Sequence, residues 1–206
     1  REAAPELVSS AQKKIVIDEL TKILKEYRDY KGILAVKRKS ILQSISNILP
    51  HNDYVNMILL NMMKISKKLF IHSVNVAIKA LILDLAWQKR HNKGLIDGLK
   101  FEWLLYGSLL HDIGLIQLGK EFYDSKRLDI MNDTRYKEYP NIGYNFLVNS
   151  KSKHGLPDEV LQIVRQHCER KDGSGFPSGL NEDAINPLAL EVGLADEFDL
   201  LCCGEM

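Results

Sequence analysis

The sequence predicts an all-α protein, and three observations support this prediction. Apolar residues recur every three to four positions over most of the chain, which is the period of an amphipathic helix. No segment shows the sustained alternation of apolar and polar residues that is typical of a half-buried strand. Prolines stand where the helical stripes start or stop, as at Pro50, Pro140, Pro157 and Pro187. A helical bundle is therefore the expected architecture.

The first fifty residues predict amphipathic helices. Residues 10–31 and 33–49 carry apolar stripes with charges between them, and Pro50 closes the second stripe. Residues 1–50 are expected to be an N-terminal extension that packs on the rest of the chain; a connector, a lid and a homodimerisation surface are the alternatives. Residues 53–89 predict one long or kinked helix.

The remaining elements follow from the same signals. Residues 91–94 predict a loop, and Phe101–Leu110 a helix that Gly114 ends. Residues 115–139 are polar and weakly patterned. Further helices are expected from Pro140 to about residue 148, from Pro157 to about residue 169, and from Pro187 towards residue 201, with a glycine-rich loop at residues 173–179.

Composition excludes several classes of partner. The chain has 206 residues, a net charge of +1 and 27% charged residues of mixed sign, so no broad basic field argues for nucleic acid or a membrane surface. Charges such as Lys79 and Asp84 interrupt the apolar stretches, and no membrane span is expected. The three cysteines, an odd number, favour reduced thiols in a cytoplasmic setting over a disulfide framework.

Four ionisable side chains occupy apolar faces of separate predicted helices: His72, Asp112, His167 and Asp196, with His111 adjoining Asp112. Each alone is more simply a hydrogen-bonded core residue or a helix cap. Together they point to a shared partner, because a buried charge that lacks a partner costs several kcal/mol. A divalent metal ion accepts imidazoles and carboxylates together, and bundle cores are common places for such ions.

Four segments, collinear over roughly residues 50–201, resemble the HD-GYP family of the bacterial HD phosphohydrolase superfamily. This resemblance implies an HD-type helical bundle and metal-dependent hydrolysis of cyclic di-GMP by a metal-activated hydroxide. It also implies that residues 51–206 form the HD-GYP-like domain, with its C-terminal part missing. The four segments are His72-Ser73-Val74-Asn75-Val76-Ala77, His111-Asp112-Ile113-Gly114, His167 to Leu180, and Ala195-Asp196-Glu197-Phe198-Asp199.

The resemblance assigns the ligands of a first metal ion to His72, His111, Asp112 and Asp196, all of which are present. Asp112 would bridge to a second ion and is therefore the candidate catalytic residue. Two imidazoles with two carboxylates suit Fe or Mn, and also Zn.

The second ion of the family has an incomplete ligand set here. His167 is present, but Tyr139 and Cys168 stand where the resemblance implies two further histidines. A cysteine thiolate can bind Zn, whereas a tyrosine is a poor ligand because its ordinary pKa is about 10. Leu115 replaces a lysine of the family pattern, and Lys68 replaces a glutamate that binds a third ion in some members. One ion is therefore expected rather than two.

The glycine-rich loop carries the third motif of the family. Phe176 stands where the family has its tyrosine. The loop is a candidate contact for the substrate, or for a protein partner if it is exposed. Its candidate residues are Arg170, Asp172, Gly173, Gly175, Phe176 and Pro177.

Three functional hypotheses remain open from sequence. The first hypothesis is a phosphodiesterase of cyclic di-GMP or a related phosphate ester, with weak activity because of the altered second site. The second hypothesis is a catalytically inactive HD-GYP-like module that binds a ligand or a partner. The third hypothesis is a mononuclear HD hydrolase that acts on another phosphate ester.

Overall fold

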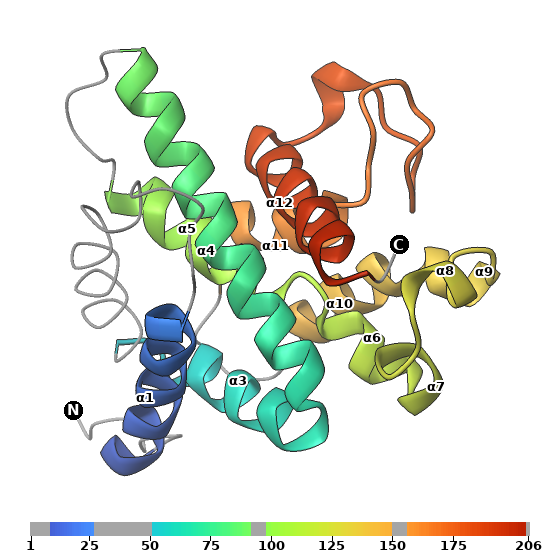
Figure 1. Cartoon of the computed structure of the whole chain (residues 1–206). Helices are drawn as coiled ribbons and strands as arrows, with labels where there is room; N and C mark the ends of the chain where they lie inside the picture. Colours follow the sequence, from blue (N-terminus) through green and yellow to red (C-terminus); the bar gives the residue numbers. More distant parts are fainter. Residues whose placement is uncertain (1–8, 27–50, 92–97, 150–155, 205–206) are drawn as a thin grey trace. The chain divides into compact units, whose positions relative to one another are not determined.

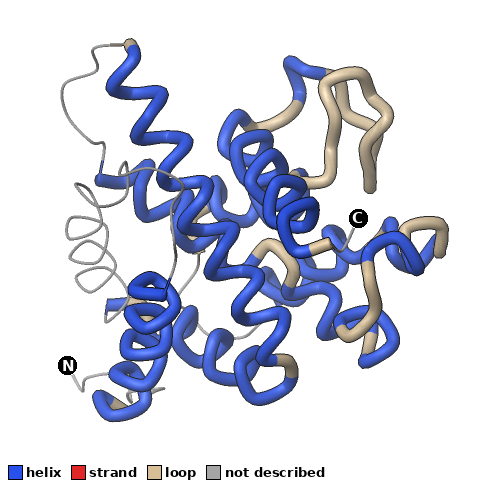
Figure 2. The backbone as a smooth tube through the Cα atoms, in the orientation of Figure 1, coloured by secondary structure: helices blue, strands red, loops and turns tan. Residues whose placement is uncertain are grey.

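The computed structural model describes residues 9–26, 51–91, 98–149, 156–204, and the expected helix at 33–49 lies outside these ranges. Within them the regular structure is helical (Figure 2). The only strand-like pairing in these ranges is an isolated bridge between Asp172 and Asn181. The all-α fold class is confirmed.

The chain divides into two compact units, residues 1–64 and 65–206. The first unit contains α1 (Ser10–Glu26) and most of α3 (Asp53–Ile65). Ser9 and Gln12 form a capping box at the start of α1, because the Ser9 hydroxyl accepts from the Gln12 amide while the Gln12 side chain accepts from the Ser9 amide. Lys13 and Asp53 form an ion pair at 2.5 Å between the two helices.

The stretch at 53–89 is broken rather than continuous. α3 ends at Ile65 and α4 (Lys67–Arg90) begins after Ser66, whose hydroxyl caps the new helix by accepting from the Leu69 amide at 3.2 Å. Residues Lys67–Gln88 are long and apolar enough to cross a membrane by length and composition alone, although no membrane span was expected from the sequence. However, 67% of that window is buried inside the fold, as in the core helix of a bundle.

The second unit is built around α4. α5 (Gly98–Leu110) and α12 (Pro187–Cys203) both pack against α4, and α11 (Asp158–Gln166) packs against α5 and α12 (Figure 1). α10 (Tyr139–Asn149) lies against α11 on one side and α6 on the other. The ends of these helices converge on one region of the core, which contains the candidate site.

Residues 113–137 form four short helices that the sequence did not predict: α6 (Ile113–Leu118), α7 (Lys120–Tyr123), α8 (Arg127–Ile130) and α9 (Thr134–Lys137). Helices of four to six residues are too short to display a period. Each is nevertheless anchored by at least one buried side chain: Leu115 in α6, Phe122 in α7, Arg127 in α8, Tyr136 in α9.

Gly114 has a different role from the helix end expected for it. α5 stops at Leu110, and Gly114 lies inside α6 where that helix crosses α10. A Cβ atom at Gly114 would lie 1.9 Å from the carbonyl oxygen of Tyr139. The missing side chain therefore lets the two backbones touch, and this contact brings Asp112 close to Tyr139.

Candidate metal centre

Three segments contribute the first group of site residues. His72 comes from α4, His111 and Asp112 from the turn between α5 and α6, and Asp196 from α12. The Nε2 atom of His72 lies 3.0 Å from Oδ1 of Asp196 and 3.4 Å from Oδ2 of Asp112. The Nε2 atom of His111 lies 3.4 Å from Oδ2 of Asp112 and 3.7 Å from Oδ1 of Asp196. All four side chains that the sequence assigned to a first ion are thus brought together.

Both imidazoles are oriented with Nε2 towards the centre of this group. Nδ1 of His111 lies 2.7 Å from the Ser108 carbonyl oxygen, and Nδ1 of His72 lies 2.7 Å from Oδ2 of Asp199. Because both partners are acceptors, each Nδ1 carries a proton and donates it. The Nε2 atoms therefore face the carboxylates of Asp112 and Asp196.

Several ligand atoms of this group are buried without a hydrogen bond. They include Nε2 of His72 and of His111, Oδ1 of Asp196 and Oδ1 of Asp112. An unsatisfied buried polar atom costs about 1–3 kcal/mol. One divalent cation would satisfy the atoms that converge here, and two neutral imidazoles with carboxylates are an ordinary donor set for it. The residues present therefore fit a metal ion.

The electrostatic environment also favours a cation. Burial opposes the charged form of His111, but the carboxylates of Asp112 and Asp196 outweigh it and raise the pKa of His111 to about 9. The pKa of Asp196 is held far below its ordinary range despite burial, chiefly by the neighbouring imidazoles of His111 and His72. The site thus holds positive charge strongly, and a metal ion would replace the imidazole protons.

The second group consists of His111, Asp112 and His167. A hydrogen bond with the Tyr139 hydroxyl occupies the Nε2 atom of His167. Nε2 of His167 lies 3.9 Å from Oδ1 of Asp112 but only 2.7 Å from the Tyr139 hydroxyl. That hydroxyl also lies 3.0 Å from Sγ of Cys168. Since Nδ1 of His167 donates to the Val164 carbonyl at 3.0 Å, Nε2 accepts from Tyr139, and Tyr139 accepts from the Cys168 thiol.

This hydrogen-bonded chain is neutral throughout. Burial, joined by the positive charge of His111, lowers the pKa of His167 to about 4. Burial raises the pKa of the Cys168 thiol and of the Tyr139 hydroxyl. A protonated thiol and a protonated phenol are poor ligands, so neither adds an anionic donor to the second group.

Arg127 is the member of the site that sequence reasoning missed. It is only 7% exposed, its Nη2 donates to Oδ2 of Asp112, and its Nη1 donates to the Tyr136 hydroxyl at 2.8 Å. Its guanidinium also lies over the Tyr139 ring, 5.4 Å from the ring centre. Because α8 has four residues, no periodicity marked this arginine as buried.

Asp199 and Lys79 were also missed as site residues. Lys79 Nζ lies 2.5 Å from Oδ1 of Asp199, the carboxylate whose other oxygen holds His72. A signal was available in the sequence. Asp199 follows Asp196 by one helical turn, and Lys79 follows His72 by two turns, so each pair shares a helix face.

A sequence profile of the HD domain family matches residues 93–206, which is more than half of the chain. The chain belongs to the HD domain family. HD domains bind divalent metal ions, in agreement with the donor set described above. The matched range begins after His72, so the first histidine of the site is supplied by α4 from outside it.

Two curated relatives of this HD domain are cyclic di-GMP phosphodiesterases by name. The response regulator RpfG of Xanthomonas campestris is 35% identical over 100 residues, which are 45% of this chain and 24% of that protein. The cyclic di-GMP phosphodiesterase of Thermotoga maritima is 32% identical over 102 residues, 47% of this chain and 26% of that protein. The matched part thus spans about a quarter of each relative. These names confirm the resemblance to the HD-GYP family.

One solved structure shares the fold. Bd1817, described as a HDG"Y"P protein from Bdellovibrio bacteriovorus, superimposes with a TM-score of 0.56 at 24% identity. The superposition covers 98% of this chain and 63% of that chain. It supports the HD-type architecture.

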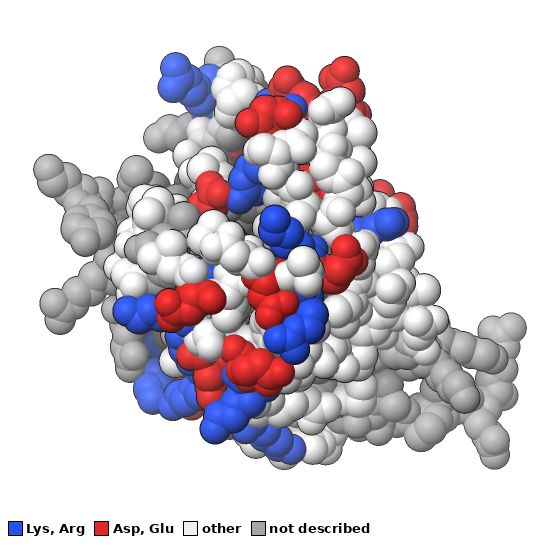
Figure 3. Space-filling view, turned by 90° about the vertical axis from the view of Figure 1, so that its right-hand side faces the viewer, with Lys and Arg blue, Asp and Glu red and all other residues white. Residues whose placement is uncertain are grey.

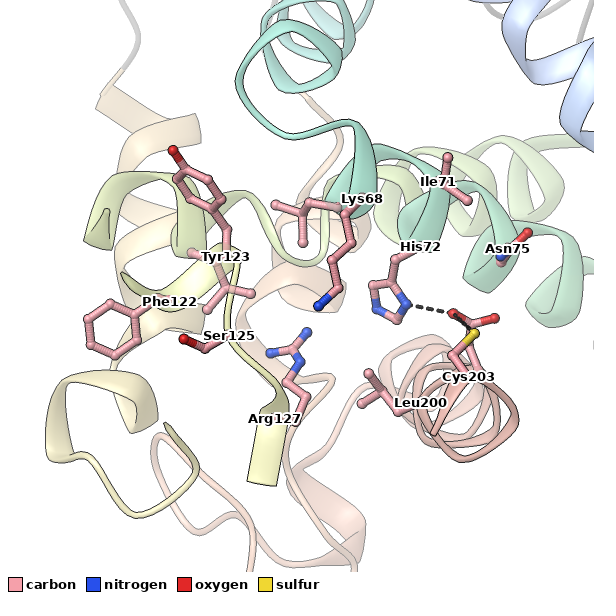
Figure 4. Close-up of a pocket in the computed structure, with 13 residues that line it drawn as sticks. Lys68, Ile71, His72, Asn75, Phe122, Tyr123, Ser125, Arg127, Leu200 and Cys203 are labelled. Atoms are coloured by element: carbon pink, nitrogen blue, oxygen red, sulfur yellow. Dashed lines mark hydrogen bonds and ion pairs between the residues drawn. The ribbon is translucent and has the colours of Figure 1, made fainter. Parts of the chain in front are cut away.

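A cavity of about 370 Å³ opens beside the first group of this HD domain. His72 lines it together with apolar residues that include Leu115 and Phe122. The charged ends of Lys68 and Arg127 point into the same space (Figure 4). The cavity therefore combines apolar walls with two cations beside the candidate ligands, a suitable environment for an organic phosphate.

Phe176 anchors the glycine-rich loop to the rest of the domain. Phe176, half-buried and joined to Pro177 by a cis peptide bond, packs against Tyr136 and Tyr139 with ring centres 5.6 and 6.2 Å away. Gly175 is needed because a Cβ atom there would lie 2.3 Å from the Arg170 amide nitrogen. The ring of Phe176 therefore extends the aromatic cluster behind the site.

The two charged candidates of this loop have structural partners. Arg170 forms an ion pair with Glu197 and donates to the Glu169 carbonyl oxygen at 3.0 Å. Asp172 accepts from the amide and hydroxyl of Ser174 within its own turn, and Gly173 has a positive φ of 77°. On the outer face shown in Figure 3, acidic and basic side chains are interleaved, consistent with the net charge of +1.

Proposed function

We propose that the chain is a metal-dependent phosphodiesterase that hydrolyses cyclic di-GMP or a closely related phosphate ester. One observation carries the proposal: the Nε2 atoms of His72 and His111 and Oδ1 of Asp196 converge without hydrogen bonds beside a cavity into which two cations point. The activities for which the two relatives are named support the same substrate class.

The proposed metal site uses His72, His111, Asp112 and Asp196, with Fe or Mn preferred and Zn as the alternative. One ion is proposed because the second group is closed by Tyr139. When bound, a divalent ion polarises phosphoryl oxygens and lowers the pKa of a water molecule.

The other residues around the cavity bind and orient the substrate in this proposal. Lys68 attracts the phosphate because its charge faces the cavity, and Arg127, whose charge is largely offset by Asp112, lies beside it. Asp199 keeps His72 in the tautomer that presents Nε2 to the site. Leu115 and Phe122 supply apolar walls that exclude water and accommodate a base.

A catalytically inactive binding module is the second candidate, and the neutral chain from Cys168 through Tyr139 to His167 favours it. Two-metal hydrolysis depends on ions about 3.5–4 Å apart, which a closed second group would prevent. In that case the cavity would bind a cyclic dinucleotide, or the loop at residues 173–177 a protein partner, without turnover.

We also propose an organisation of the chain into two parts. Residues 51–206 would form the HD-GYP-like domain, and residues 1–50 an extension available for homodimerisation. The three cysteines are free thiols, which supports a reducing cytoplasmic compartment.

The test is a turnover assay on the full chain, purified without oxygen, with its metal content measured in the same preparation. Linear dinucleotide that forms in proportion to bound metal, and is lost in His111→Ala, would support the phosphodiesterase. Binding of cyclic di-GMP without product would support the inactive module. Hydrolysis of small phosphomonoesters alone would favour a mononuclear hydrolase of another class. Absence of metal, binding and product would reject all three.

A further inference from the structure

We propose that Arg127 takes the place of a second metal ion: its guanidinium is a fixed cation that neutralises Asp112 and makes the centre mononuclear. This inference rests on the proposed metal site and deepens it, because it explains why one ion suffices. Arg127 is an unusual residue to bury, since a guanidinium outside water needs an anion and several acceptors. The surroundings of Arg127 supply these.

The first step is the contact between Arg127 and Asp112. Nη2 of Arg127 donates to Oδ2 of Asp112, the same oxygen that lies 3.4 Å from Nε2 of His72 and of His111. An arginine side chain stays protonated in proteins, and the Asp112 carboxylate offsets the cost of burying this charge. The charge on Arg127 is therefore permanent. It lies against Asp112, the carboxylate that the family resemblance assigns to both ions.

The second step is the charge balance of the centre. Its three carboxylates, Asp112, Asp196 and Asp199, face two side-chain cations, Lys79 and Arg127. With neutral imidazoles, one negative charge is left over. One divalent ion more than neutralises it, and a second would add surplus positive charge next to a fixed guanidinium. Like charges at this range in a buried site repel strongly.

The third step is that the neighbours of Arg127 are the residues that close the second group. Its guanidinium lies 5.4 Å from the ring centre of Tyr139 and 5.5 Å from that of Tyr136, and Nη1 donates to the Tyr136 hydroxyl. Tyr139 in turn donates to Nε2 of His167. The arginine, the two tyrosines and the histidine thus form one connected arrangement, whose polar groups have partners without an ion.

The test compares metal stoichiometry in four forms of the full chain: wild type, Tyr139→His with Cys168→His, and that pair combined with either Arg127→Met or Arg127→Lys. Bound Mn²⁺ is counted by elemental analysis after equilibrium dialysis. Electron paramagnetic resonance distinguishes an isolated Mn²⁺ from two ions close enough to couple. We expect one ion in the wild type, one in the histidine pair, one with Arg127→Lys, and two coupled ions only with Arg127→Met.

The outcomes separate the inference from the proposed function. No bound ion in the wild type would reject the metal site, and the inference with it. One ion in the wild type and two in the histidine pair would overturn the inference alone, since Arg127 would then be no obstacle. This comparison retains Arg127 and is informative even if Arg127→Met does not fold. One ion in a folded Arg127→Met combination would assign Arg127 a purely structural role and would also overturn the inference.

Discussion

The imidazole of His72 is fixed by Asp199, whose Oδ2 lies 2.7 Å from Nδ1. Lys79 holds the other oxygen of this carboxylate at 2.5 Å, so Asp199 cannot rotate away without breaking an ion pair. Asp199 therefore does for His72 what a backbone carbonyl does for His111. The hydrogen bonds at Nδ1 orient both histidines, so their Nε2 atoms face the carboxylates without a bound ion.

Asp199→Asn should lower the affinity for a divalent ion by about 10–100-fold, because the substitution removes the negative charge that fixes the tautomer and raises the basicity of His72. The affinity is measured by competition with a fluorescent chelator. Glu197→Gln is the matched control on the same helix, since Glu197 pairs with Arg170 rather than with the site. Equal affinities in the two variants would mean that Asp199 does not orient the ligand.

Lys68→Ala should weaken binding of cyclic di-GMP about 5-fold and reduce the salt dependence of binding, because one of the two cations that face the cavity is removed. Lys67→Ala is the control, since Lys67 is exposed at the start of the same helix and does not line the cavity. Both affinities are measured by calorimetry at two salt concentrations. A loss of the same size in both variants would indicate a general charge effect instead of a contact in the cavity.

The sequence predicted the long helices and the first ligand group because both depend on short-range patterns. His72 and Asp196 lie on the apolar faces of helices with many turns, where period and family motif agree. The structure brings them within 3.0 Å, which places the four expected side chains in one group. Helix faces and family motifs together therefore pointed to these side chains, whereas helix faces alone did not single out Asp199 and Lys79.

Arg127 and the closure of the second group were not predictable in the same way. Arg127 lies in a four-residue helix, too short for periodicity, and its burial results from contacts with Tyr136 and Tyr139 on other elements. Sequence comparison indicated that Tyr139 and Cys168 replace histidines. It could not indicate that their hydrogens complete a chain to His167, because this depends on the three-dimensional crossing of α6, α10 and α11.

Glu169→Ala should destabilise the glycine-rich loop. Glu169 is 1% exposed, and its two carboxylate oxygens accept from the amides of Ser178 at 2.7 Å and Leu180 at 2.9 Å. Removing the acceptor leaves both amides without their partner, at a cost of about 1–3 kcal/mol. Urea unfolding gives the free energy of unfolding, and limited proteolysis should cut the loop faster.

The control for the loop is Glu182→Ala, because Glu182 is exposed and forms only a surface ion pair with Lys171 near the same loop. We expect its unfolding midpoint and its proteolysis rate to equal those of the wild type. If Glu169→Ala behaved like this control, the two amide contacts would not be what holds the loop.

Gly114→Ala should destabilise the fold by at least about 2 kcal/mol, because the added Cβ atom would lie 1.9 Å from the Tyr139 carbonyl oxygen and 2.9 Å from the Gly143 amide nitrogen. Neither obstacle is the end of a flexible side chain, so α6 must move away from α10. This movement would also pull Asp112 away from Tyr139, and metal affinity should fall together with stability.

Gly98→Ala is the control, since a Cβ atom at Gly98 meets nothing within 4 Å and alanine has a higher helix propensity than glycine in α5. Thermal and urea unfolding compare the two variants, and a Gly114→Ala protein as stable as Gly98→Ala would mean that α6 and α10 do not touch through their backbones.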